Sequence, residues 1–171
     1  MNKLGTWDIV YSWGVLHHTG QMWPALEHAA QRVNNDGLLF IAIYNDQGRA
    51  SRMWLRVKQL YNALPSALRW LVLGPALMRL WGPTSARDIL RGRPFHSWRS
   101  YAESGLRGMS PWRDVVDWVG GLPFEVATPE EIFRFHRDLG FELIELRTCS
   151  GGLGCNEFVF RRKTSQISTL R

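Results

Sequence analysis

Two adjacent histidines, His17 and His18, have the clearest capacity for chemistry in this sequence. An imidazole titrates near neutral pH, so either ring could remove a proton from a reacting group as a general base. Adjacent residues of a turn point in different directions, and we expect at most one of the two, with His18 favoured, to face a ligand. The alternative is that both are structural histidines, hydrogen bonded within the protein.

Both histidines follow a short aromatic and β-branched run, WDIVYSW, that ends at Gly14. This run predicts a buried strand over 7–12. A second apolar run, LLFIAIY at 38–44, is typical of a strand buried on both faces of a parallel sheet. Tyr44 and Asn45 end this second strand and could orient an acceptor molecule through hydrogen bonds. The alternative is that they only terminate the strand.

A helix is expected between the two strands. Apolar residues recur with helical spacing over 22–33, and Pro24 lies near the first turn, where its missing amide is harmless. A polar turn at 34–37 follows. The order strand, helix, strand predicts an α/β fold built on parallel strands.

The C-terminal part of the chain predicts one helix and two strands. Thr128 to Glu131 form a capping box with proline at the first helical position, and Gly140 stands where a left-handed C-terminal cap belongs, so we expect a helix over 129–139. Strands are predicted over 141–148 and 157–162. The glycine-rich loop between them is too short for a crossover helix, so these strands should pair antiparallel.

The sequence predicts four regions: a strand, helix, strand core at 1–46, a helical insertion at 47–110, C-terminal core helices and strands at 111–163, and a frayed tail at 164–171. Two or three helices are expected in the insertion, separated by its prolines and glycines. The net charge of +6 is concentrated there, since residues 47–107 hold eleven Arg or Lys residues against Asp88 and Glu103.

The segment DIVYSWGVLHHTG at 8–20, the alanine-rich helix, the polar turn with Gly37 and the strand LLFIAIYN together resemble the fourth and fifth strands of class I S-adenosylmethionine-dependent methyltransferases. That family continues with a helix, a sixth strand and an antiparallel seventh, the order expected here through Arg162. The resemblance covers essentially the whole chain, and the insertion is its least similar part. It implies the C-terminal half of a Rossmann-like methyltransferase sheet.

The resemblance also implies S-adenosylmethionine as cofactor and a place for it. In doubly wound sheets, ligands bind at the carboxyl ends of the strands where the strand order reverses, which puts Ser12, Trp13 and Gly14 at the cofactor crevice. Gly14 would let the backbone approach the ligand closely, although an ordinary turn glycine is the alternative. Methyl transfer needs alignment of donor and acceptor and requires no metal. One of the two histidines, with His18 favoured over His17, would remove a proton from the acceptor.

The departures from the family matter as much as the match. A complete member has three further strands upstream, with a glycine-rich turn and an acidic residue that accepts the ribose hydroxyls. Only residues 1–6 precede the first strand here. Gly151, Gly152 and Gly154 are followed by a strand, so they cannot form the cofactor cradle of a strand-to-helix turn. We therefore expect a fragment that is inactive or impaired on its own.

Two alternatives remain open. A non-catalytic or complementing half could dock on a partner chain through the exposed edge of the sheet. A peripheral membrane module could use residues 49–81, where arginines flank a broad apolar face, to bind an anionic membrane surface. The same insertion could also cover a lipid-like, quinone-like or anionic acceptor. Nucleic acid is not expected, because the charges accompany an apolar face.

The remaining features bear on localisation. No apolar stretch is long enough to span a membrane, and no signal peptide is visible. Cys149 and Cys155 lack the paired spacing of a zinc site and are too few for a disulfide scaffold, which favours a reducing compartment. We expect a cytoplasmic protein, with peripheral membrane association as the variant.

Overall fold

The computed structural model describes residues 5–104 and 110–163, which form two compact units. One unit combines the described residues up to Ser51 with those from Pro123 onward, and the other runs from Arg52 to Leu122. The two units divide the chain after Ser51 and after Leu122. The predicted regions have their boundaries elsewhere, after residues 46 and 110, and these boundaries stay predictions. The predicted tail at 164–171 lies outside the described residues.

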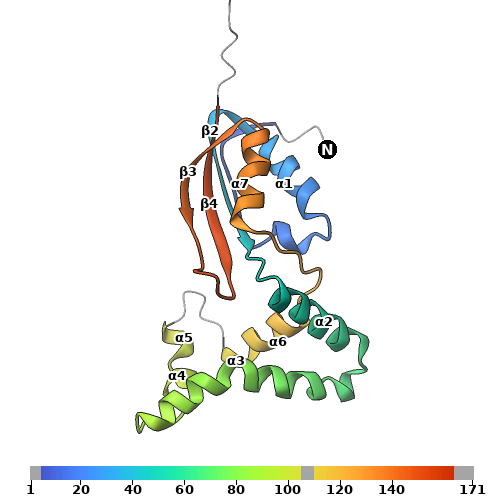
Figure 1. Cartoon of the computed structure of the whole chain (residues 1–171), viewed down its shortest axis with the longest axis vertical. Coiled ribbons are helices and arrows are strands. Elements are labelled where there is room, and N and C mark those ends of the chain that lie inside the picture. Colours follow the sequence, from blue (N-terminus) through green and yellow to red (C-terminus); the bar gives the residue numbers. More distant parts are fainter. Residues whose placement is uncertain (1–4, 105–109, 164–171) are drawn as a thin grey trace, which may run out of the picture. The chain divides into compact units, whose positions relative to one another are not determined.

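The first unit is a four-stranded sheet covered by helices on one face (Figure 1). The strand order is β1-β2-β4-β3, with β1 (Trp7–Trp13) parallel to β2 (Val33–Tyr44). Strand β4 (Cys155–Arg162) pairs antiparallel with both β2 and β3 (Phe141–Arg147). The mixed α/β class predicted from the sequence is confirmed.

Helices α1 (Met22–Ala30) and α7 (Pro129–Asp138) pack on the same face of this sheet (Figure 1). Alternation along the strands sends every second side chain of β2 and β4 toward these helices, and these side chains form the core. The buried apolar side chains of the core are Met22, Leu26, Ala30, Val33, Leu39, Ile41, Ile43, Ala127, Ile132, Phe141, Phe158 and Phe160.

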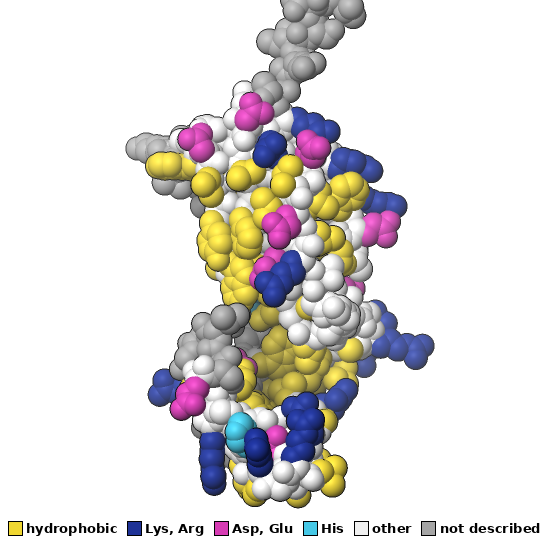
Figure 2. All heavy atoms as spheres, turned by 90° about the vertical axis from the view of Figure 1, so that its left-hand side faces the viewer, with side chains coloured by type: hydrophobic (Ala, Val, Ile, Leu, Met, Phe, Trp, Pro, Cys, Tyr) yellow, Lys and Arg dark blue, Asp and Glu magenta, His cyan; other side chains and the backbone are white. Residues whose placement is uncertain are grey.

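The prediction that β1 is a buried strand was wrong. Strand β1 lies at the edge of the sheet, and Trp7, Ile9 and Tyr11 are 59%, 68% and 66% exposed. These side chains point away from the helix-covered face, and no described helix covers them. Tyr11 stacks on Phe40 of the neighbouring strand, with 5.1 Å between ring centroids. Figure 2 shows hydrophobic side chains gathered on this open face.

The predicted helix over 22–33 is too long, because Val33 already begins β2. The expected turn at 34–37 forms an irregularity inside that strand, where Asp36 has φ +59° and the register with β1 shifts. Gly37 is needed in it: a Cβ there would lie 2.9 Å from the Val33 side chain and from the Asn34 carbonyl oxygen.

The C-terminal helix agrees closely with its sequence prediction. The Thr128 hydroxyl accepts a hydrogen bond from Glu131 N, and the Glu131 carboxylate accepts one from Thr128 N, which is the predicted capping box. Gly140 follows the helix with φ +84°, the left-handed conformation expected of its cap.

The second unit is helical. Helix α2 (Arg49–Ala63) leads into it, and α3 (Trp70–Leu90), α4 (His96–Arg99), α5 (Tyr101–Ser104) and α6 (Pro111–Gly120) follow. The described residues of 47–110 hold four α-helices and the short 3-10 helix Ser66–Leu68, where two or three helices were expected. The prediction that Pro75 and Pro83 separate helices was wrong, because α3 runs through both. No helix among the described residues combines the length and apolarity needed to cross a bilayer.

Lys58 belongs to the basic insertion, yet its side chain is buried within the second unit. Its ammonium donates a hydrogen bond to Trp118 O and lies 4.4 Å from the centre of the Trp118 ring. Burial lowers the pKa of Lys58 to about 8.

Candidate functional site

Three segments of the first unit meet where β1 and β2 end: the turn after β1, the last residues of β2, and the segment 123–127. Backbone hydrogen bonds hold them together. Glu125 N donates to His17 O at 3.1 Å, and Ala127 N donates to Tyr44 O at 3.0 Å. The candidate residues near both strand ends therefore share one rigid framework, to which the segment before α7 also belongs.

Gly14 begins the turn after β1 in a conformation that favours glycine. Its φ is +71°, and its N–H donates to Ala42 O at 3.2 Å, which continues the β1–β2 pairing by one residue. A Cβ built on Gly14 would meet no described atom within 4 Å. The backbone at this strand end thus faces open space that a ligand could fill.

Ser12 and Trp13 leave β1 on opposite faces, as alternation along a strand requires. Ser12 is half-buried on the helix-covered face, opposite Ile41 of β2. Trp13 lies on the other face, where its indole N–H donates to the Glu157 carboxylate at 2.9 Å. Of the three residues predicted to bind the cofactor, only Gly14 is in the turn itself.

His18 is oriented by a backbone carbonyl. Its Nδ1 donates a hydrogen bond to Pro123 O at 2.7 Å, because a carbonyl can only accept. In the neutral ring this places the proton on Nδ1 and leaves the Nε2 lone pair able to take a proton. His18 therefore has the tautomer that a general base needs, in a half-buried position at the end of β1.

His17 has a different environment. It is fully buried in the 3-10 turn Leu16–His18, and its Nδ1 accepts a hydrogen bond from Tyr44 N at 3.4 Å. Burial lowers the pKa of His17 to about 3, the charge of His18 lowers it further, and the Ala42 carbonyl opposes the shift. A ring with so low a pKa is a poor proton acceptor near neutrality, so His17 fits the structural alternative.

Tyr44 lies beside both histidines, whereas the Asn45 side chain contacts strand β4. The Tyr44 ring centroid is 3.9 Å from that of His17 and 5.3 Å from that of His18. The Asn45 side-chain oxygen accepts from the Asn156 amide at 3.0 Å, which ties the end of β2 to the start of β4. The structure brings Tyr44, His17 and His18 together, whereas the Asn45 side chain is hydrogen bonded to Asn156 instead.

Pro123, Phe124 and Glu125 belong to this site, and sequence reasoning missed all three. The Pro123 carbonyl sets the His18 tautomer, and the Phe124 ring lies 5.5 Å from that of Tyr44. Both Glu125 carboxylate oxygens accept from Met22 N at 3.1 Å, which places negative charge at the N-terminus of α1. Nothing in the local pattern of 121–127 indicates that this segment returns to a site more than a hundred residues upstream.

Comparison with known protein families gave no match, and comparison with curated proteins gave none either. Among solved structures, the chain is similar to a protein described as an O-methyltransferase family protein from Burkholderia thailandensis. The two share 14% sequence identity with a TM-score of 0.45. The alignment covers 96% of this chain and 32% of that protein, so this chain spans about a third of the other protein's length.

Proposed function

We propose that this chain forms one wall of an S-adenosylmethionine site and serves methyl transfer to a small-molecule or lipid-like acceptor. The observation that carries the proposal is Gly14, which ends a parallel strand in a left-handed conformation with open space above its Cα. The sequence around it, DIVYSWGVLHHTG, is the part that resembles class I methyltransferases. Ligands of such sheets bind at this end of the strands.

The residues present fit this cofactor and the chemistry it brings. When bound, S-adenosylmethionine supplies a methyl group on an activated sulfonium. The backbone at Gly14 permits close approach of a ligand, and His18 Nε2 can take a proton from an acceptor hydroxyl, amine or acidic carbon. The Tyr44 ring lies against both histidine rings and adds an aromatic surface beside them.

A second candidate role is supported by a separate observation. In this role the chain is one half of a sheet that a partner protein completes. Edge strand β1 pairs on one side only, and its exposed Trp7, Ile9 and Tyr11 present an apolar face that no described element covers. Such an edge favours pairing with a further strand. In this variant the partner would supply the remaining wall of the cofactor site.

Calorimetry with S-adenosylmethionine at millimolar concentration tests the proposed function. We expect weak binding to the chain, and Gly14→Ala should weaken it by about tenfold, roughly 1.4 kcal/mol, because the added methyl group occupies ligand space. Gly140→Ala is the matched control: its φ is also positive and its Cβ is also unobstructed, but it caps α7. Absence of binding, or equal effects of the two substitutions, would contradict the proposal.

A further inference from the structure

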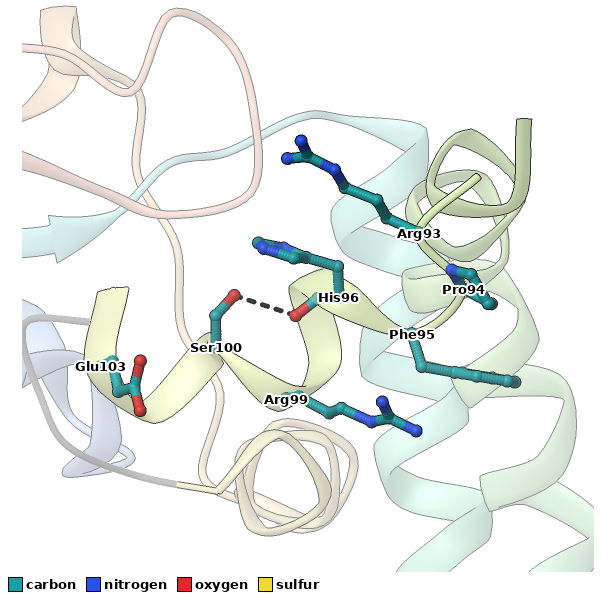
Figure 3. Close-up of a pocket in the computed structure, with 7 residues that line it drawn as sticks. All are labelled: Arg93, Pro94, Phe95, His96, Arg99, Ser100 and Glu103. Carbon is teal, nitrogen blue, oxygen red and sulfur yellow. Dashed lines mark hydrogen bonds between the residues drawn. The ribbon is translucent and has the colours of Figure 1, made fainter. Parts of the chain in front are cut away.

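The helical second unit contains three neighbouring cavities that the proposed function does not use. The first, of about 660 Å³, is lined by Arg93, Pro94, Phe95, His96, Arg99, Ser100 and Glu103 (Figure 3). The second, of about 450 Å³, shares His96 and Ser100 with it and adds Arg87. The third, of about 370 Å³, shares Phe95 with the first. The common lining residues show that the three cavities are adjacent on the surface of this unit.

The two ends of this surface differ in chemistry. Arg93, Arg99 and His96 surround the first cavity, and Glu103 is the one carboxylate in its lining. None of the arginines that line the cavities forms an ion pair with a described carboxylate. Guanidinium groups such as those of Arg93 and Arg99 favour a carboxylate or phosphate, which they bind through charge-assisted hydrogen bonds.

The third cavity is apolar. Its lining comes mainly from Leu77, Met78, Trp81 and Trp98, and the Trp81 and Trp98 rings meet edge to face with 4.8 Å between centroids. Met78 is 75% exposed, so the α3 side of this hollow opens to solvent. An alkyl or prenyl chain laid there would remove this apolar surface from water.

Phe95 lines both the first and the third cavity and is held in an unusual conformation. Its φ of +58° lies in the left-handed region, which is rare and strained for a bulky residue, yet its side chain is 55% exposed. Core packing cannot be the reason for this backbone strain, because the Phe95 ring is exposed. The strain therefore points to a role of Phe95 in binding. In Figure 3, Arg93 and His96 extend on one side of α4, while Phe95 and Arg99 leave it on the other.

The loop that carries these residues is fixed by Asp88, which is buried at the end of α3. Its carboxylate accepts hydrogen bonds from Ser97 N at 2.7 Å and from the Ser97 hydroxyl at 2.9 Å, and its carbonyl accepts from Arg93 N at 2.9 Å. The backbone under both Arg93 and His96 is therefore held in place before a ligand arrives, which lowers the entropic cost of binding.

We infer that this surface binds a single amphiphilic anion, with a phosphate or carboxylate head at Arg93 and His96 and an apolar chain passing Phe95 into the hollow at Trp81 and Trp98. The inference goes beyond methyl transfer and does not depend on it. A lone headgroup or a bilayer would use only one end of the surface, whereas one amphiphile uses both.

Calorimetry with n-decyl phosphate below its micelle concentration tests this inference, with inorganic phosphate, decanol and anionic phosphatidylglycerol vesicles as comparison ligands. We expect decyl phosphate to bind at least tenfold more tightly than phosphate or decanol. Arg93→Gln should weaken it about tenfold or more, the loss expected for one charge-assisted hydrogen bond. Arg79→Gln, an equal change of charge at an exposed position of α3 outside the cavities, should leave it unchanged.

Two further variants separate binding from folding. Phe95→Gly should weaken decyl phosphate binding about tenfold without lowering the melting temperature, because glycine adopts this φ freely. Met78→Asp at an exposed position should weaken decyl phosphate but not phosphate. Equal losses for Arg79→Gln and Arg93→Gln would overturn the inference, as would binding to vesicles alone or equal affinity for phosphate and decyl phosphate.

Discussion

Replacing His136 with phenylalanine should make the fold less sensitive to acid. His136 is fully buried between α7 and the sheet, where its ring stacks on Phe160 with 4.4 Å between centroids. Its Nδ1 donates to Ile132 O at 2.9 Å, while Nε2 finds no partner among the described residues. Burial lowers the pKa of His136 from 6.5 to about 4, against the opposing effect of the Ile132 hydrogen bond.

The sign and size follow from proton linkage. Below pH 6.5 the unfolded chain binds a proton at this ring while the folded chain does not, so stability falls as the pH decreases toward 4. With these two pKa values, His136 alone costs about 2 kcal/mol of unfolding free energy between pH 7.5 and pH 5. Phenylalanine keeps a flat ring in the stack and cannot titrate.

Urea denaturation at pH 7.5 and at pH 5.0, followed by circular dichroism, measures this difference. We expect His136→Phe to reduce the loss of stability between the two pH values by about 2 kcal/mol, whatever packing cost it adds at both. His28→Phe, at an exposed position of α1, is the matched control and should retain the acid loss because both buried histidines remain. If His136→Phe loses as much stability on acidification as the parent chain, the reasoning from burial is wrong.

Other predictions concern Thr128, Lys58 and His18. Thr128→Ala removes the capping box and should lower the free energy of unfolding by about 1 kcal/mol in urea denaturation; no change would contradict the cap. Because the pKa of buried Lys58 is about 8 rather than 10.5, the parent chain should gain about 2 kcal/mol between pH 7.5 and 9.5, and Lys58→Met should lack this gain in the same assay. In a class I methyltransferase that carries the same VLHHT segment, replacing the second histidine with alanine should lower turnover about a hundredfold, and unchanged turnover would make it structural.

The sequence predicted the elements whose signals are local. The capping box at Thr128 and the left-handed Gly140 lie within a few residues of the helix they bound, and both are present. The run predicted over 7–12 became β1 almost unchanged, and the run over 38–44 lies inside β2, which begins earlier, at Val33. The prediction from Pro75 and Pro83 also used a local signal, since proline usually breaks a helix. It was wrong because α3 continues past both residues.

What the sequence did not predict depends on contacts between distant segments. Burial of β1 was inferred from composition, which cannot show whether a second layer covers the strand. The roles of Pro123 and Glu125 arise because their segment returns to His18 and to α1 after more than a hundred residues. The different environments of His17 and His18 likewise come from tertiary contacts, since the two residues are identical and adjacent.

The most direct test of the central claim is to map the residues of this chain that respond to S-adenosylmethionine. Two-dimensional amide NMR of the labelled protein, titrated with S-adenosylmethionine, would show which backbone groups respond. The account predicts shifts confined to the turn from Gly14 to His18 and the end of β2 at Tyr44, and none at Gly140. Absence of shifts, or shifts confined to the helical unit, would contradict a cofactor-binding site at the end of β1.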